Sequence, residues 1–464
     1  GNKTYTRKIL FTGNDVTQDH VLRREMRQFE GAWTSDNSIE AGKVRLERLG
    51  YFKEVNVETI PVVGTEDQID IVYSVDEETT GSVGGNIGYS DFGLMLGFNL
   101  QEQNFLGTGN TVGIGINKNI YSEMYNLSFM NPYATKDGVS LGYNVYFRET
   151  DYGEFNVANY LTNSNGFGAQ FGYPTLDITR LGFNVTYDKT DIDVGTLPAL
   201  EIYDFVSAEG NIFETLSVQF SWQRVTLNRG LFPTAGSSTV ISLSTTVPGS
   251  DLSYYRSSIR QRYYRPLSSN FVFGFSGELG YLDAYGETEE TPFFQNFYAG
   301  GPRSLRGFES NTLGPRSTDA PCYEFNYEEK TCPNLIDTDG DGELDSPYIN
   351  PYANSTSRYR DRPIGGNIKV EGSMQLIFKL PFIEDQRSLR SAFFFDFGNV
   401  FSDNCKDYQI NCYKPALEDL RYSYGVGVTW ITGFGPLSLA ISKPTNAGPQ
   451  ERTEEFQFTV GNVF

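Results

Sequence analysis

Few residues of this chain have the types and spacing that covalent chemistry requires. His20 is the only histidine, which leaves little room for histidine-based catalysis or for a zinc site. The four cysteines stand in two close pairs, Cys322 with Cys332 and Cys405 with Cys412. Local pairs without metal-ligand spacing predict disulfides, and disulfides indicate an oxidising compartment. We therefore expect no catalytic residues and a protein that is not an enzyme.

The acidic run 337–345 has the spacing of a calcium loop. Its carboxylates stand at relative positions 1, 3, 5 and 9, and a glycine at position 6: Asp337, Asp339, Asp341, Asp345 and Gly342. Position 12 is Tyr348, where a bidentate glutamate is expected, and no flanking helices are evident. Calcium is thus the one cofactor that these residues suggest, and an acidic loop in solvent explains them as well.

The composition narrows the kind of fold that could carry these residues. The chain has 464 residues, 15% of them aromatic and 48 of them glycine, yet its mean hydropathy is negative. No run of about 18 apolar residues occurs, so a helix that spans a membrane is excluded. This composition suits a transmembrane β-barrel, in which only alternate residues face lipid, although a large soluble β-sandwich or barrel could share it. The net charge, 37 − 58 = −21, argues against nucleic acid as a partner.

From about residue 82 the pattern alternates with a period of two. In one such segment every second residue is apolar: Leu181, Phe183, Val185 and Tyr187. We count about sixteen segments, joined alternately by short turns and by longer connections, of which 286–366 is the longest. Short turns opposite long loops are typical of outer-membrane barrels. The predicted fold over residues 80–464 is therefore a transmembrane β-barrel of 16 antiparallel strands. Because the number of strands is even, the chain can enter and leave the barrel on the same, periplasmic side.

Barrel closure pairs the first strand with the last, and these two strands differ from the rest. The first is rich in glycine and leaves few packing residues: Gly84, Gly85, Ile87 and Gly88. The last strand has aromatic and aliphatic residues on one face, Phe456, Phe458, Val460 and Phe464, and also contains Gly461. Glycine weakens a strand through entropy and lost cross-strand contacts, so we predict a weak lateral seam. Alternatively, the glycines only relieve crowding at a curved strand.

Residues 1–79 are predicted to form a separate small α+β domain. Its elements follow the order β-α-α-β-β: a strand over 4–12, a helix with Val21, Leu22, Met26 and Phe29 on one face, a helix over 38–49, and strands over 52–60 and 68–76. A three-stranded sheet has an exposed edge, which could accept an extended peptide by β-augmentation.

Two stretches resemble known families. The segment from Arg48 to Val57 resembles the signature of POTRA domains. The Gly300-Gly301 pair followed by Arg306-Gly307-Phe308 resembles the sixth-loop motif of the Omp85 superfamily. The stretch beyond it is most similar to the members of that superfamily that assemble outer-membrane proteins: Ser310, Asn311, Thr312, Gly314 and Pro315.

This resemblance implies that the loop 286–366 folds into the barrel lumen, where Arg306 meets acidic side chains of the inner wall. The matching acid is Asp396, which the flanking lipid-facing phenylalanines turn inward. The family often has a glutamate on the preceding strand. Gln375 stands at that position here, so Glu371, four residues earlier on the same face, is the candidate substitute.

The resemblance also implies a function. The chain would be a central component of the machinery that folds and inserts β-barrel proteins through the lateral seam, in the outer membrane of a Gram-negative bacterium. Expected partners are unfolded outer-membrane proteins, membrane lipids, and accessory outer-membrane lipoproteins at the periplasmic POTRA domain. A secretion transporter of the same superfamily and a passive pore are the alternatives. Because the chain opens at Gly1 without a signal peptide, we expect a mature segment of a longer protein.

Overall fold

The computed structural model describes most of the chain. The described residues are 3–90, 93–135, 137–155, 157–158, 160–176, 178–194, 199–318, 362–380, 383, 388–407, 409, 411–432 and 435–461. The predicted Cys322–Cys332 disulfide, the calcium-type run 337–345 and Phe464 lie outside these residues.

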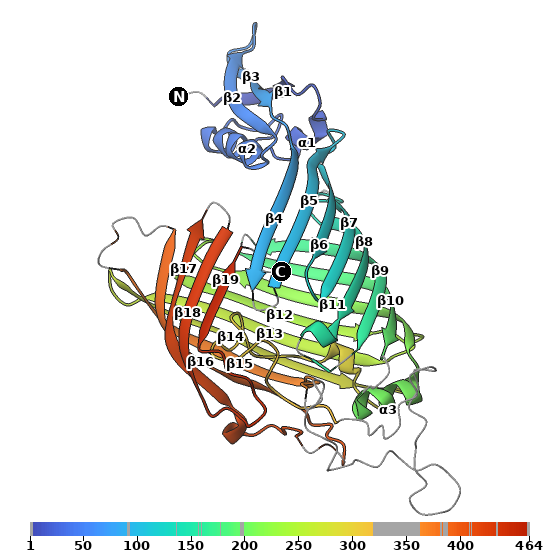
Figure 1. The fold of residues 1–464 in the computed structure, drawn as a ribbon. Coiled ribbons are helices and arrows are strands. Elements are labelled where there is room, and N and C mark those ends of the chain that lie inside the picture. The colour runs from blue at the N-terminus through green and yellow to red at the C-terminus, as the bar shows by residue number, and fades with distance from the viewer. Residues whose placement is uncertain are drawn as a thin grey trace, which may run out of the picture. The chain divides into compact units, whose positions relative to one another are not determined.

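The N-terminal domain is a three-stranded sheet with two helices (Figure 1). Its elements are β1 (Tyr5–Thr12), α1 (Asp19–Arg23), α2 (Asp36–Arg48), β2 (Phe52–Pro61) and β3 (Gln68–Glu77). The central strand β3 runs parallel to β1 and antiparallel to β2, so β1 and β2 are the edges of the sheet. This is the predicted β-α-α-β-β order.

The core of this domain forms where the apolar faces of its helices meet the sheet. Leu22 and Leu46 are fully buried against Ile71 and Tyr73. The expectation for Phe29 is wrong: its side chain is 71% exposed. Because α1 ends at Arg23, residue 29 lies outside the helix. The helical spacing therefore does not apply to Phe29 and cannot predict the direction of its side chain.

One compact unit contains this domain together with parts of the first barrel strands: residues 1–84, 98–115 and 126–144. Within it, Asn104 Nδ2 donates a hydrogen bond of 2.8 Å to the Thr17 hydroxyl. The Tyr51 hydroxyl donates to the carbonyl of Gln103 at 3.1 Å. Burial raises the pKa of Tyr51, so this hydroxyl stays protonated and remains a donor. The domain is thus fastened to the turn between the second and third barrel strands.

The remaining strands close into a barrel. Its sixteen described strands are, in chain order, β4 (Gly81–Ser90), β5 (Gly93–Phe105), β6 (Asn110–Lys118), β7 (Ser122–Asn131), β8 (Ser140–Asp151), β9 (Leu161–Leu176), β10 (Thr179–Asp193), β11 (Ile212–Val225), β12 (Gly236–Thr246), β13 (Tyr254–Pro266), β14 (Phe271–Ala284), β15 (Ile368–Phe378), β16 (Leu389–Phe401), β17 (Arg421–Thr432), β18 (Gly435–Thr445) and β19 (Phe456–Val460). Each pairs with its neighbours in sequence, and β19 returns to β4 (Figure 1).

The predicted barrel is confirmed, and alternation explains it strand by strand. On β16, Phe393 and Phe395 are 51% and 41% exposed, whereas Phe394 and Asp396 are buried on the other face. One face therefore presents aromatic rings outward, and the other turns polar and small residues inward. Among the described residues, no helix is long and apolar enough to cross a membrane.

The longer connections contain elements that a period of two does not reveal. A helix, α3 (Leu200–Glu209), lies between β10 and β11 and buries Phe205. The Phe205 ring meets Phe293 at 5.4 Å between centroids, and Phe293 meets Tyr160 at 4.8 Å, which gives these connections an aromatic core of their own. Between β16 and β17, Cys405 and Cys412 form the predicted disulfide, with an S–S distance of 2.01 Å.

Candidate functional site

Part of the connection between β14 and β15 packs against the inner faces of the last barrel strands. Three of its apolar side chains are at most 1% exposed: Leu305, Phe308 and Leu313. They share a cluster with Val400 of β16 and Leu282 of β14. Burying these side chains offsets the entropy of ordering a long loop, so residues 296–318 have a defined path inside the barrel.

Arg306 binds Asp396 through two parallel hydrogen bonds. Its Nε lies 2.7 Å from Asp396 Oδ2 and its Nη2 lies 2.7 Å from Oδ1. The backbone N–H of Arg306 also donates to Oδ2 at 3.2 Å, and Nη2 donates to the Ser373 hydroxyl at 3.1 Å. The guanidinium carbon lies 3.4 Å from the centre of the Phe394 ring. Asp396 is fully buried, so the bidentate pair compensates a charge that water does not reach.

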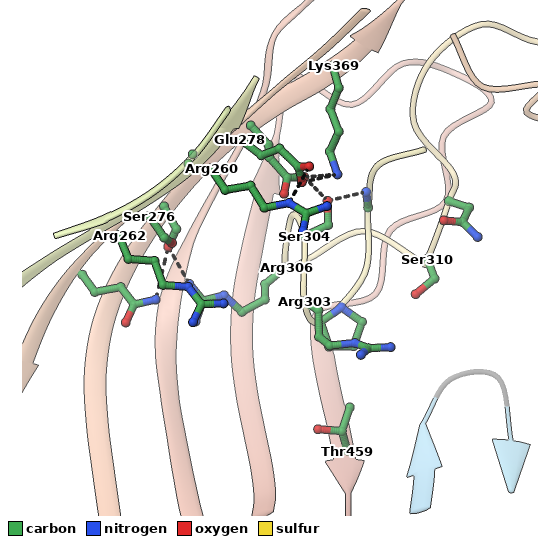
Figure 2. A pocket seen from close by; sticks show the side chains of 18 of the residues that line it. Arg260, Arg262, Ser276, Glu278, Arg303, Ser304, Arg306, Ser310, Lys369 and Thr459 are labelled. Atoms are coloured by element: carbon green, nitrogen blue, oxygen red, sulfur yellow. Dashed lines mark hydrogen bonds and ion pairs between the residues drawn. The ribbon is translucent and has the colours of Figure 1, made fainter. Parts of the chain in front are cut away.

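The other two expected wall partners of Arg306 do not touch it. Glu371 accepts a hydrogen bond of 2.6 Å from the Ser304 hydroxyl and pairs with Lys369 at 3.1 Å (Figure 2). Gln375 donates to the Ser373 hydroxyl at 3.3 Å. The structure therefore places both on the same wall as Asp396, where Glu371 holds the loop two residues before the arginine.

The loop motif has a further partner that spacing does not single out, Gln457 on β19. Its side-chain Nε2 donates to the Phe308 carbonyl at 2.8 Å, and its Oε1 accepts from the Gly307 N–H at 3.2 Å. Gln457 is 2% exposed. The side-chain amide of Gln457 thus forms hydrogen bonds with two buried backbone groups of the loop, as the backbone of a neighbouring strand would. The alternation of β19, which turns Phe456 and Phe458 outward and Gln457 inward, is the only signal in the sequence.

Gly307 is required at this contact for two reasons. Its φ is +92°, which residues with a side chain rarely adopt. A Cβ there would also lie 3.2 Å from the Ser442 Oγ and 3.3 Å from the Ser423 Cβ. The motif can approach the inner wall this closely only without a side chain at position 307.

The motif also pairs with the backbone that leads into β19. The Glu454 N–H donates to the Gly307 carbonyl at 2.9 Å, and the Glu309 N–H donates to the Arg452 carbonyl at 3.0 Å. Phe308 and Thr453 form an isolated antiparallel bridge. The final strand is therefore held from inside the barrel by the loop, independently of its neighbours in the wall.

Replacing Gln457 with alanine should loosen this hold. The Gly307 N–H and the Phe308 carbonyl would stay buried without their partner, at a cost of about 1–3 kcal/mol. We expect a lower urea midpoint for unfolding and faster proteolysis within the loop. The matched control is Gln375→Ala, because Gln375 is also a wall glutamine but does not contact the motif. Equal midpoints for the two variants would show that Gln457 does not secure the loop.

Among the described residues, the two strands that close the barrel meet through one register pair, Val460 opposite Tyr89. By contrast, β17 and β18 pair continuously from Tyr422 opposite Thr445 to Thr432 opposite Gly435. The Tyr89 and Phe458 rings lie 6.5 Å apart across the junction. Within the described lengths of β4 and β19, most of the hydrogen-bonding capacity is therefore not used in pairing the two strands with each other.

The predicted seam glycines have different roles. A Cβ on Gly85 would meet no described atom within 4 Å, and one on Gly84 would meet only the Asn99 carbonyl at 4.0 Å, so crowding does not account for them. Gly461 has a φ of +77°, and a Cβ there would lie 2.4 Å from the Ile87 carbonyl. It ends β19 where the chain comes closest to β4. Gly88 lies on β4 next to this approach.

No group of three or more metal-ligating side chains occurs in the described part of the chain. The candidate calcium residues Asp337, Asp339, Asp341 and Asp345 fall outside that part, so calcium binding stays a prediction. The described site contains the buried Arg306–Asp396 ion pair and the hydrogen bonds by which Gln457 holds the loop backbone. It also contains the junction of β4 and β19, where one pair of described residues is in register. These features can bind and align polypeptide backbone.

Two family models match the chain. The model of the Omp85 superfamily domain matches residues 104–464. The POTRA model, described as a surface antigen variable number repeat, matches residues 4–78.

Known proteins agree with both models. Outer membrane protein assembly factor BamA of Neisseria meningitidis serogroup B is 31% identical over 491 residues, which cover 100% of this chain and 57% of that protein. The crystal structure of BamA from Haemophilus ducreyi lacking POTRA domains 1–3 has a TM-score of 0.83 at 32% identity and covers 100% of this chain and 85% of that one. CdiB from Escherichia coli, with a TM-score of 0.56 at 12% identity over 99% of this chain and 76% of that one, shares the fold.

Proposed function

Because the chain belongs to the Omp85 superfamily, we propose that it folds β-barrel proteins and inserts them into the outer membrane through the junction of β4 and β19. The barrel lies in the outer membrane of a Gram-negative bacterium, with the POTRA domain in the periplasm. The relatives that support this role are assembly factors, and the chain spans 57% of the length of the one from Neisseria meningitidis. The role requires no covalent chemistry.

One observation carries the proposal: in the part of the chain that the structure describes, β4 and β19 share one register pair. Separation of such a junction breaks few hydrogen bonds and exposes two strand edges, which can pair with the strands of an incoming protein. The loop motif keeps β19 in place from inside while this happens, through Gln457 and the backbone of residues 452–454. The loop also occupies part of the lumen, which argues against a passive pore.

The proposed partners follow from the proposed role and from the membership in the Omp85 superfamily. Unfolded outer-membrane proteins are the substrates, and accessory outer-membrane lipoproteins dock at the POTRA domain. Lipids beside the junction are the third partner. The described β19 has five residues, and a short apolar band of the wall beside β4 would thin the adjacent bilayer by hydrophobic mismatch.

Reconstitution in liposomes tests the proposal. The chain is inserted together with its accessory lipoproteins, a urea-unfolded β-barrel protein is added, and its folding is followed by the heat-dependent shift on gels. We expect faster folding than in liposomes with the lipoproteins alone. An unchanged folding rate would rule out the insertase function, whereas export of a soluble partner into the vesicles would favour the secretion transporter.

A further inference from the structure

Three adjoining cavities open along the inner wall of the barrel, with volumes of about 760, 290 and 980 Å³. The first and second are both lined by Arg303, Arg306 and Thr459. The second and third are both lined by Phe232 and Arg390. The shared residues show that these cavities adjoin one another in a row, here called the path, from three short turns to the two strands of the junction.

This path is cationic in a chain whose net charge is −21. The third cavity is lined by Arg229, Lys379 and Arg390, and no described carboxylate faces it. The second has Arg303 and Arg306 beside Arg390, again without a carboxylate among its described lining residues. Positive charge is therefore concentrated at the end of the path that the short turns surround.

Acidic residues enter only in the first cavity, where they are already engaged. Arg260 lies 2.8 Å from Glu278, and Lys369 reaches both Glu278 at 3.3 Å and Glu371 at 3.1 Å. Figure 2 shows Arg260 and Lys369 pointing toward Glu278 from different strands. These ions neutralise one another, and Asp396 neutralises Arg306, so the positive charge that the path can offer to a ligand comes from other residues.

Two arginines in particular have no carboxylate within 4 Å among the described residues. Arg262 lies on β13 opposite Ser276 and lines the first cavity. Arg390 stacks its guanidinium on Tyr264 at 4.9 Å, and its buried Nη2 donates no hydrogen bond to a described group. A buried donor without an acceptor is costly, so Arg390 is suited to an anion that arrives from outside the chain.

We propose that the path binds acidic segments of polypeptide, with Arg262 and Arg390 as the principal ligands of their carboxylates. This rests on the proposed function, because unfolded barrel proteins supply such segments. This chain, itself a barrel protein, has a net charge of −21, and its run 337–345 shows how strongly acidic residues can be concentrated in one loop. The path ends at Ser90 of β4 and Thr459 of β19, so an acidic loop of the substrate would cross the lumen while its flanking strands pair at the junction.

Polypeptide fits the path better than lipid. In the first cavity the neutral lining is largely hydroxyl and amide, including Ser276, Ser373 and Gln375, and it offers little surface to acyl chains. The second cavity mixes polar Ser438 and Gln457 with apolar Leu439. Guanidinium groups spaced along a polar path match carboxylates spaced along an extended chain.

Peptide binding to the refolded full chain in nanodiscs of zwitterionic lipid tests the proposal. The probe is a fluorescein-labelled peptide with the sequence of residues 337–345, read by fluorescence anisotropy beside a neutral version with Asn and Gln in place of the acids. We expect the acidic peptide to bind the unmodified chain, and to bind R262Q/R390Q about tenfold more weakly. The control K118Q/K189Q removes the same charge outside the lumen, from pairs with Glu123 and Glu214, and should bind like the unmodified chain.

The heat shift on gels shows that each variant is folded before it is compared. Equal affinity for R262Q/R390Q and the control would overturn the proposal, as would equal binding of the neutral peptide. Displacement of the bound acidic peptide by phosphatidylglycerol vesicles or by inorganic phosphate would assign the path to phosphate groups and also overturn the proposal. Binding is measured without any folding reaction, so a chain that accelerates folding but does not bind the peptide refutes only this inference.

Discussion

Replacing Arg306 with alanine is expected to destabilise the barrel by about 3–5 kcal/mol, because it leaves the fully buried Asp396 without its counter-ion. The backbone N–H of residue 306 would still donate to Asp396, but this single contact does not balance the charge. The loop should detach from the wall, which also weakens the hold on β19. A lower midpoint in urea, loss of the heat-resistant band on gels and rapid cleavage within the loop would report this change.

Two further variants separate the ion pair from general damage to the loop. Arg452→Ala is the control. Arg452 pairs with Glu309 at 3.4 Å on an exposed part of the same contact, so its substitution should lower the stability of the barrel only slightly. In the double variant R306A/D396A no buried charge remains, so it should be more stable than R306A alone. A midpoint for R306A that matches that of R452A would contradict the role of the pair.

Locking the junction with a disulfide between Y89C and V460C should abolish the folding of substrate proteins. These two residues face each other across the closing strands, so an oxidised pair would prevent the separation that exposes both edges. Activity in the liposome assay should fall to the level of lipoproteins alone, and a reductant should restore it.

The matched control places the disulfide one strand away, between L439C and F458C, which face each other on β18 and β19. This bond joins two strands that need not part, so its oxidised form should retain activity. Both variants keep the native Cys405–Cys412 disulfide, and any effect of the reductant on that bond is common to the two. Full activity of the oxidised Y89C/V460C chain would exclude lateral opening.

Much of the barrel follows from the sequence, because a period of two is a local property of each strand. Alternation at Phe393, Phe395 and their neighbours is enough to turn Asp396 inward, and the pattern of short and long connections predicts the number of strands. Local pairing likewise predicts the Cys405–Cys412 disulfide, since its two residues are separated by only seven positions. The helical spacing of apolar residues gives a wrong prediction where the helix is short, as the exposed side chain of Phe29 shows.

The partners of the loop motif are decided only by the tertiary structure. Asp396, Glu371 and Gln375 all face inward by the same rule, and alternation cannot rank them as ligands of Arg306. Gln457 holds Gly307 across a separation of 150 residues, and no local pattern encodes a contact of that kind. The junction of β4 and β19 is similar: glycine content indicates a weak strand, but only the register shows a single pair. Pairing and lumen contacts depend on how distant strands align around the barrel, which is a property of the closed ring and not of any one segment.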